Sequence, residues 1–142
     1  MRIAIASDHA GFRYKEATKD FLVRKGYEVR DFGTYSEQST DYPLFVRPAA
    51  EAVASGTCAQ GIVLGGSGNG EAMVANRVRG IRCAVCWDER SARLAREHNN
   101  ANMIALGQRM MPQRMALKIV ETWLSAEFQG GRHQRRIDQI EG

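Results

Sequence analysis

The sequence has little cysteine and no long apolar run. Its 142 residues include only three cysteines, an odd number that does not support a disulfide framework. The amino-terminal stretch becomes polar at Ser7 and Asp8, too early for a signal peptide or for a membrane span of about 20 apolar residues. We therefore expect a cytoplasmic protein with reduced cysteines and no membrane partner.

Internal repeats, low-complexity blocks and interdomain linkers are also missing. A length of 142 residues with 44% hydrophobic residues fits one compact domain whose core needs no disulfides. The clearest interruption is Gln129-Gly130-Gly131, which precedes the basic run 132–136. We predict a single domain over residues 1–142, with a basic carboxyl-terminal segment over 129–142.

The charge balance is only slightly basic, with 20 Lys and Arg against 16 Asp and Glu. This balance permits an anionic partner, and the planar guanidinium of arginine can hold a phosphate through two hydrogen bonds. Arg132 and Arg136 would point the same way if their segment is helical, and so could bind one anion. The sequence lacks the aromatic platform or recognition helix of a nucleic-acid binder, so we expect no nucleic-acid partner.

Short apolar runs alternate with longer amphipathic segments, which is typical of an α/β fold with a parallel sheet covered by helices on both faces. The predicted strands are residues 2–7, 27–32, 61–64, 82–87 and 103–106. The predicted helices are residues 11–25, 43–55, 70–78, 88–97 and 112–128. Functional groups of such sheets gather where strands end and helices begin.

The glycine-rich segment Gly65–Glu71 lies between a predicted strand and a predicted helix. Its four glycines allow close approach of a ligand to the backbone and can direct amide N–H groups at negative charge. A tight turn without a ligand is one alternative. A mononucleotide-binding loop is another alternative, but Glu71 stands where such a loop has lysine. A dinucleotide-binding loop is a third, supported only by Asp88, which lies about 20 residues further on and could bind a ribose.

Glu71 opens the predicted helix, where an acidic residue is also favoured by the helix dipole alone. The hydroxyl of Ser67 and several backbone donors lie on the same loop. Such a set can remove a proton next to a carbonyl group while the amides stabilise the resulting enediolate. This combination favours a catalytic interpretation of the loop.

Two further motifs carry histidine. Asp8 and His9 follow the first strand, where Asp8 could cap a helix and His9 could bind phosphate or transfer a proton. His98 and Asn99 precede the fifth strand. They could belong to a functional site, or they could simply end a helix, with Asn99 in a left-handed conformation.

Cys83 and Cys86 lie three residues apart in a predicted strand, so their side chains should point to opposite faces of the sheet. This arrangement does not suit a metal site or a redox pair, and we expect both to be core thiols. Cys58 lies in a predicted turn.

Taken together, four motifs resemble those of the ribose-5-phosphate isomerase B family, which also includes galactose-6-phosphate isomerase subunits. The motifs are Asp8-His9-Ala10-Gly11, Gly65–Glu71 with Ala75-Asn76 following, Arg93–Asn100 and Arg132-His133-Gln134-Arg135-Arg136. The resemblance covers nearly the whole chain. It implies a Rossmann-like three-layer sandwich with a five-stranded parallel sheet, a homodimer or tetramer with active sites between subunits, and no metal or other cofactor.

The resemblance also assigns roles to residues. Many members have a cysteine base where this chain has Gly65, so the chain resembles the actinobacterial branch in which Glu71 would be the base, assisted by Ser67. Asp8 and His98 would open the furanose ring, and Asn99 would bind the reacting end. The remaining matches are the loop residues Gly66, Gly68, Asn69 and Gly70 around the enediolate and the phosphate ligands His9, Arg109, Arg132, His133 and Arg136.

We therefore predict an aldose–ketose isomerase that interconverts D-ribose 5-phosphate and D-ribulose 5-phosphate through an enediolate. Isomerisation of another sugar phosphate, such as allose or galactose 6-phosphate or a tetrose phosphate, is the alternative, because sugar length depends on the shape of the segment 31–42. A non-catalytic nucleotide-binding module is a second alternative.

Overall fold

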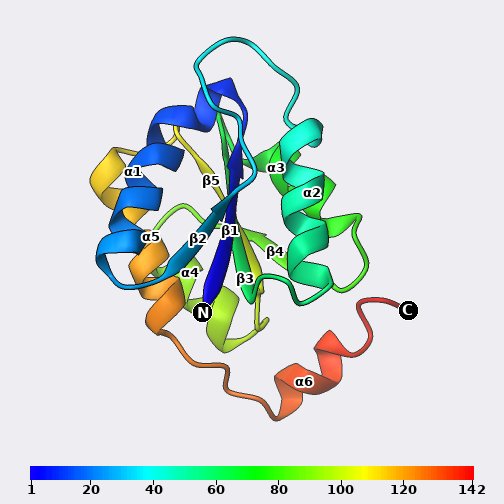
Figure 1. The fold of residues 1–142 in the computed structure, drawn as a ribbon. Helices are drawn as coiled ribbons and strands as arrows, with labels where there is room; N and C mark the ends of the chain where they lie inside the picture. The colour runs from blue at the N-terminus through cyan, green and yellow to red at the C-terminus, as the bar shows by residue number, and fades with distance from the viewer.

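The computed structural model describes all residues from 1 to 142 and contains a parallel sheet of five strands in the order β2-β1-β3-β5-β4 (Figure 1). The strands are β1 (Arg2–Ser7), β2 (Glu28–Asp31), β3 (Gln60–Gly65), β4 (Cys83–Val85) and β5 (Met103–Gly107). The helices are η1 (His9–Gly11), α1 (Phe12–Arg24), α2 (Pro43–Ala54), α3 (Asn69–Asn76), α4 (Glu89–Glu97), α5 (Gln113–Ser125) and α6 (Arg132–Ile137). The predicted α/β class and parallel sheet are confirmed.

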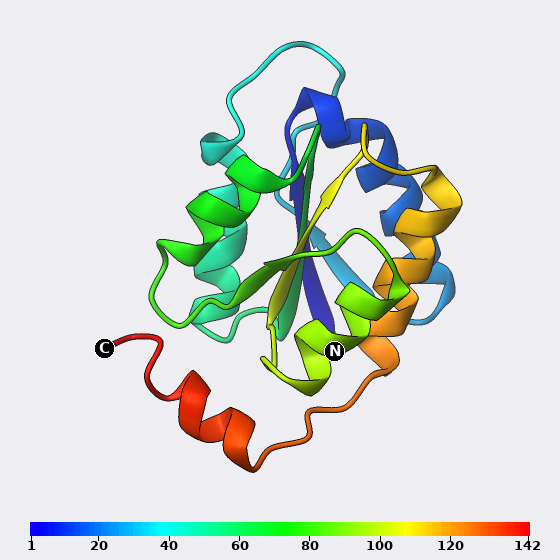
Figure 2. The same cartoon turned by 180° about the vertical axis from the view of Figure 1, so that it is seen from behind.

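The central strands are buried on both faces, and residue size alternates along β1. Ile3 and Ile5 of β1 belong to one core cluster, together with residues of α1, α4 and α5. Ala4 and Ala6 point to the other face and pack with α2 and α3. Figures 1 and 2 show these two helical layers on either side of the sheet. Small residues on the second face allow α2 and α3 to approach the sheet closely.

The boundaries differ most from prediction at two elements, and the others agree within two residues at each end. β4 is only Cys83–Val85 rather than residues 82–87, and the side chain of Asn76 hydrogen-bonds both the N–H (2.8 Å) and the C=O (2.9 Å) of Cys83 at this sheet edge. α5 ends at Ser125 rather than at 128 because Ala126 takes an extended conformation. No helix is long and apolar enough to cross a lipid bilayer.

The basic carboxyl-terminal run forms a short helix, α6, which lies at one end of the molecule, beside the end of α4 (Figure 2). Arg132 and Arg136 are one helical turn apart in it and both are exposed. The predicted helical pairing of these two arginines is therefore confirmed.

The cysteines are core residues, as predicted for Cys83 and Cys86. All three are free and buried, and these two belong to the clusters on opposite faces of the sheet. Burial raises the pKa of Cys83 strongly and raises the pKa of Cys86 to about 12, with a smaller contribution from the charge of Asp88. Neither thiol is therefore prepared to act as a nucleophile or base.

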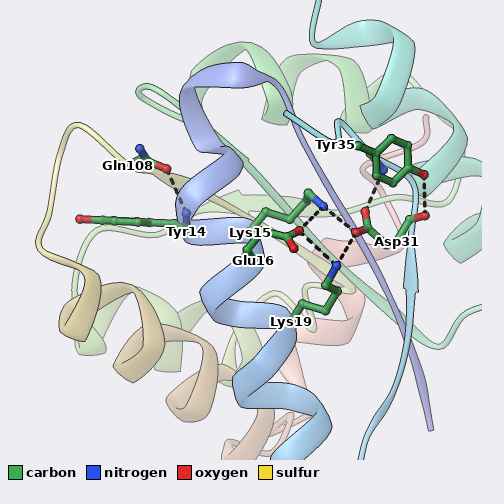
Figure 3. Close-up of polar contacts among 8 residues, drawn as sticks. Tyr14, Lys15, Glu16, Lys19, Asp31, Tyr35 and Gln108 are labelled. Carbon is green, nitrogen blue, oxygen red and sulfur yellow. Dashed lines mark hydrogen bonds and ion pairs between the residues drawn. The ribbon is translucent and has the colours of Figure 1, made fainter. Parts of the chain in front are cut away.

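A buried lysine that the sequence patterns did not reveal joins α1 to the end of β2 (Figure 3). The side chain of Lys15 is fully buried, and its Nζ lies 2.6 Å from Oδ2 of Asp31 and 2.9 Å from Oε2 of Glu16. Lys19 adds a contact of 3.0 Å to the same oxygen of Asp31, and the ring of Tyr35 lies over the Lys15 ammonium. The network fixes the point from which the chain leaves β2 toward residues 33–42.

This network predicts a loss of stability in acid. Burial alone would oppose ionisation of Asp31, but hydrogen bonds from Lys15, the Gly33 amide and Lys19 outweigh it, so the pKa is lowered. A lowered folded-state pKa contributes stability above the unfolded value of about 3.9, and this contribution is lost as the pH falls through the folded-state pKa. Asp31→Asn should reduce the free energy of unfolding by roughly 2 kcal/mol at pH 7, measured by urea denaturation.

The same titration supplies the control for this prediction. The difference between wild type and Asp31→Asn should shrink below about pH 4, because protonation removes the charge that the substitution removes. An equal difference at pH 7 and pH 3 would show that packing rather than the ion pair stabilises this junction. The surface pair Arg2–Glu28, whose side chains are 40% and 66% exposed, should contribute less than about 1 kcal/mol.

Candidate active site

The ends of β1, β3 and β5 bring together the first group of predicted site residues, which we call the carboxyl-end half-site. It consists of Asp8, His9, Ser67, Glu71 and Arg109 together with the intervening loop residues 66–70. The amides of Gln108 and Arg109 donate to the carbonyls of Gly65 (2.8 Å) and Gly66 (3.0 Å), which binds the end of β5 to the loop. The Arg109 guanidinium lies over Gly66, with Nη1 3.1 Å from where a Cβ would be.

The Glu71 carboxyl group is enclosed at the centre of this half-site. The residue is 3% exposed, lies in the first turn of α3, and reaches back to the end of β3. A Cβ on Gly65 would coincide with this carboxyl group, so the absence of a side chain at 65 makes the space that Glu71 fills. Burial raises the Glu71 pKa, its own backbone N–H partly offsets this, and the charge of Asp8 raises it further.

A raised pKa makes Glu71 a stronger base than an exposed carboxylate. Proton abstraction is most efficient when the pKa of the base approaches the working pH. A helix-terminal acid that served only the helix dipole would gain nothing from burial within range of the charge of Asp8. The geometry therefore supports the interpretation of Glu71 as a base.

Gly65→Ala should displace the Glu71 carboxyl group, because the added methyl group would occupy the space that this carboxyl group fills. The kcat of a reaction in which Glu71 is the base should then fall at least about tenfold. Overpacking should also reduce the free energy of unfolding by about 1–3 kcal/mol. Steady-state kinetics of this variant, of Glu71→Gln and of the double variant provide the measurement. If Gly65 acts through Glu71, the double variant should be no slower than Glu71→Gln, whereas multiplicative losses would contradict that coupling.

The glycine-rich loop can present backbone and hydroxyl hydrogen-bond donors to a ligand. Gly68 adopts a left-handed conformation (φ 88°), and a Cβ there would lie 3.0 Å from the Leu106 backbone. The Ser67 hydroxyl oxygen accepts a hydrogen bond from the Asn69 amide (3.2 Å), so its hydrogen is available to a ligand. Ser67 and Asn69 are exposed, as a ligand contact requires.

Asp8 is a helix cap, one of the two interpretations that the sequence allowed. Its Oδ1 accepts from the amides of Ala10 (2.9 Å) and Gly11 (3.2 Å), and the residue is 8% exposed. The cap orients Asp8 toward the same strand ends as Glu71 without engaging its second oxygen in these bonds. A structural and a chemical role are therefore compatible for this residue.

The segment over 33–42, which was expected from the sequence only to set sugar length, also supplies contacts to residues of the half-site. The backbone N–H of Thr40 donates to Nδ1 of His9 (3.2 Å), so Nε2 of the neutral imidazole carries the proton and is a donor. The Tyr42 ring packs on Gly70, where a Cβ would approach it to 2.6 Å. A backbone amide leaves no signal in the sequence, which explains why Thr40 was missed.

The second group, which we call the amino-end half-site, consists of His98, Asn99, Arg132, His133 and Arg136. All but Arg132 line a hollow of about 370 Å³ that Ile137 and Ile140 complete. The imidazole rings of His98 and His133 are stacked, with centroids 4.3 Å apart and planes 13° apart. The sequence allowed a left-handed conformation for Asn99 at the end of α4. This was wrong, because the left-handed residue is Asn100 (φ 45°).

The two half-sites lie at opposite ends of the sheet. Residues 98–102 precede β5, whereas 107–109 follow it, and its five residues span about 16 Å. Figure 1 shows α6 at the end opposite the loop that connects β2 to α2. One chain therefore does not bring His98 to Glu71. No cluster of three or more His, Cys, Asp or Glu side chains is placed to hold a metal ion.

Comparison with known proteins identifies the family. The model of the ribose/galactose isomerase family matches residues 3–140. The chain belongs to this family. Ribose-5-phosphate isomerase B of Escherichia coli strain K12 is 43% identical over 139 residues, which cover 98% of this chain and 93% of the relative. The protein of the same name from Mycolicibacterium paratuberculosis is 45% identical over 97% of this chain and 88% of its own.

Solved structures of family members share the fold. Ribose-5-phosphate isomerase B of Clostridium thermocellum superposes with a TM-score of 0.97 at 54% identity, covering 99% of this chain and 95% of that one. The enzyme of the same name from Mycoplasma genitalium, solved with bound ribulose-5-phosphate, gives 0.94 at 41% identity, with 98% and 93% covered. The resemblance found in the motifs is therefore confirmed for the family and the fold.

Proposed function

We propose that this protein is an aldose–ketose isomerase that interconverts D-ribose 5-phosphate and D-ribulose 5-phosphate. The observation that carries the proposal is the enclosed Glu71 carboxyl group at the glycine-rich turn, with a raised pKa and with backbone donors beside it. The names of relatives 43–45% identical, and the ribulose-5-phosphate bound to the Mycoplasma genitalium enzyme, support the choice of substrate. We place the enzyme in the cytoplasm and in pentose phosphate metabolism.

Ring opening comes first, because the aldopentose phosphate is mainly a cyclic hemiacetal. A base takes the proton of the anomeric hydroxyl, the bond between C1 and the ring oxygen breaks, and an acid protonates that oxygen. Asp8 and His98 are the two groups we assign to this step, and Asn99 binds the reacting end. His98 and Asn99 face the hollow of the amino-end half-site.

Proton transfer between carbons follows. Glu71 removes the proton from C2, the electron pair moves onto O1, and amides of the loop and the Ser67 hydroxyl stabilise the resulting enediolate. The hydroxyl proton of O2 then passes to O1, and the same carboxyl group returns the carbon-bound proton to C1. General base catalysis contributes roughly 10²–10⁴-fold, and one oxyanion donor about 10²–10³-fold. The loop positions involved are Gly66, Gly68, Asn69 and Gly70.

The active site is completed by a second copy of the chain, with the carboxyl-end half-site of one copy facing the amino-end half-site of the other. Within one chain the half-sites lie beyond opposite ends of β5, a strand about 16 Å long, so this arrangement is required if both act on one five-carbon sugar. A homodimer with a two-fold axis contains two such sites. Arg132 and Arg136 of one copy then reach the phosphate together with His9 and Arg109 of the other.

The phosphate ligands make a separate prediction. Arg136→Ala should raise KM at least about tenfold and also lower kcat, because binding energy at the phosphate positions the reacting carbons. Arg135 lies beside Arg136 on α6 and is exposed, so Arg135→Ala is the matched control and should change KM less than about twofold. Initial rates over a range of ribose 5-phosphate concentrations measure both. Equal KM values for the two variants would remove Arg136 from the phosphate site.

The decisive experiment incubates the purified protein with ribose 5-phosphate in heavy water. Formation of ribulose 5-phosphate, followed by NMR, together with deuterium at the exchanging carbon supports the proposal. Allose 6-phosphate, galactose 6-phosphate and erythrose 4-phosphate form the comparison set. A protein that turned over one of these and left the pentose unchanged would have a different substrate, and a protein inert toward all of them would not be a sugar-phosphate isomerase.

A further inference from the structure

The rings of His98, at the end of α4, and His133, in α6, are stacked on one another. The centroid separation of 4.3 Å and the angle of 13° describe nearly parallel, face-to-face rings. Residues flanking the pair are also tied together, because the Gln129 amide donates to the Glu97 carbonyl (3.0 Å). The His133 amide in turn donates to Gly130 (3.2 Å). The bond from Gln129 to Glu97 thus joins the segment before α6 to the residue that precedes His98.

His133 differs from the arginines on either side of it. It is 8% exposed, and its Nε2 is buried without a hydrogen-bond partner in the chain, whereas Arg132 and Arg136 are exposed. Burial lowers the His133 pKa, and the nearby His98, Arg132 and Arg136 lower it further. A neutral imidazole whose face is covered by His98 is a weaker ligand for phosphate than a guanidinium group. Arg132 and Arg136 already supply two guanidinium groups.

We propose that His133 is a positioning residue, whose ring holds the His98 imidazole in the orientation that opens the furanose ring, rather than a ligand of the phosphate. This inference rests on the proposed function and on its assignment of ring opening to His98. The flat neutral face of His133 restricts rotation of the His98 ring and also tolerates a positive charge on it, as aromatic faces do for cations. The phosphate contacts are then made by the arginines and His9.

The chemistry of the two substrates separates this role from a general structural one. Ribose 5-phosphate must open its ring before C2 can lose a proton. Ribulose 5-phosphate carries its phosphate on O5, the oxygen that would close a five-membered ring onto C2, so it is an open chain. Exchange of its C1 hydrogen with solvent therefore requires Glu71 and the loop but does not require ring opening.

The experiment compares His133→Ala, His133→Phe and the control Arg135→Ala in two assays. His133→Ala should lower kcat for ribose 5-phosphate at least about tenfold with KM within about threefold, because orientation rather than binding is lost. His133→Phe keeps a flat neutral ring, and it should stay within about threefold of wild type, as should the control. Washout of deuterium from C1-labelled ribulose 5-phosphate should stay within about threefold of wild type in all three variants.

Three results would overturn the inference. A rise in KM in both the alanine and phenylalanine variants would make His133 a phosphate ligand. An equal loss of ring-dependent turnover and of deuterium washout would make its role structural. A phenylalanine variant as slow as the alanine variant would exclude stacking. If His133→Ala does not fold, His133→Leu fills the same volume without a flat face and should show the same separation of the two assays.

Failure of the proposed function gives a different pattern. In that case the wild-type protein neither isomerises ribose 5-phosphate nor washes deuterium from ribulose 5-phosphate. Wild-type activity in both assays combined with any of the three contradicting results rejects only the role of His133.

Discussion

Glu71→Gln should lower kcat for ribose 5-phosphate at least about a hundredfold and leave KM within a few fold. The substitution keeps the size of the side chain and its place against Gly65 but removes the ability to take a proton. A hundredfold loss corresponds to about 2.7 kcal/mol of transition-state stabilisation. Steady-state kinetics in both directions of the reaction measure it, and near-normal turnover would exclude Glu71 as the base.

A matched control separates catalysis from the helix dipole. Glu89 occupies the first turn of α4 as Glu71 occupies that of α3, but Glu89 is exposed. Glu89→Gln should change the free energy of unfolding by less than about 1 kcal/mol and leave kcat unchanged. If Glu71→Gln had the same small effects, the acid at 71 would serve only to stabilise its helix.

The burial of Glu71 determines the direction in which kcat/KM should change with pH. A base acts in its ionised form, so activity should fall as the pH is lowered through the Glu71 pKa. Because burial and Asp8 raise that pKa, the acid limb of kcat/KM should lie above the value of an exposed glutamate, about 4.3. Asp8→Asn removes the neighbouring charge and should move this limb to lower pH. A limb that does not move would mean that another group titrates.

The sequence predicted the sheet and the loop because both depend on local patterns. Alternating apolar and amphipathic segments specify strands and helices, and four glycines beside an acid specify a turn with exposed amides. The burial of Glu71 near the charge of Asp8 could not be predicted from the sequence, since it depends on two strands meeting. Burial of Lys15 and the hydrogen bond from Thr40 to His9 join segments 16 and 31 residues apart, for the same reason.

The stacking of His98 shows a different limit. The predicted parallel sheet already puts His98, just before β5, at the end opposite Glu71. The histidine stack, by contrast, depends on how the segment after Ser125 turns back to α4, which the glycines at 130 and 131 permit but do not determine. Long-range geometry of this kind is set by packing rather than by local propensity.

Two inactive variants should restore each other if each site takes one half from each copy. Glu71→Gln damages the carboxyl-end half-site and His98→Asn the amino-end half-site. In a heterodimer of the two, one site carries both changes while the other carries neither, so purified heterodimer should show about half of wild-type kcat per dimer. Co-expression with two different affinity tags, followed by purification through both, yields this species for kinetic measurement.

The control pairs two changes in the same half-site, Glu71→Gln with Ser67→Ala. Every site of that heterodimer contains one damaged half, so no wild-type site forms and its activity should equal the mean of the two parent variants. Restoration in the first pair and not in the second requires that the two half-sites come from different chains, since variants that merely stabilised each other would recover in both. If the first pair also gives only the mean of its parents, the opposite ends of the sheet do not act on the same sugar. His98 would then have no part in the reaction at Glu71, and ring opening would fall to Asp8 and the residues around it.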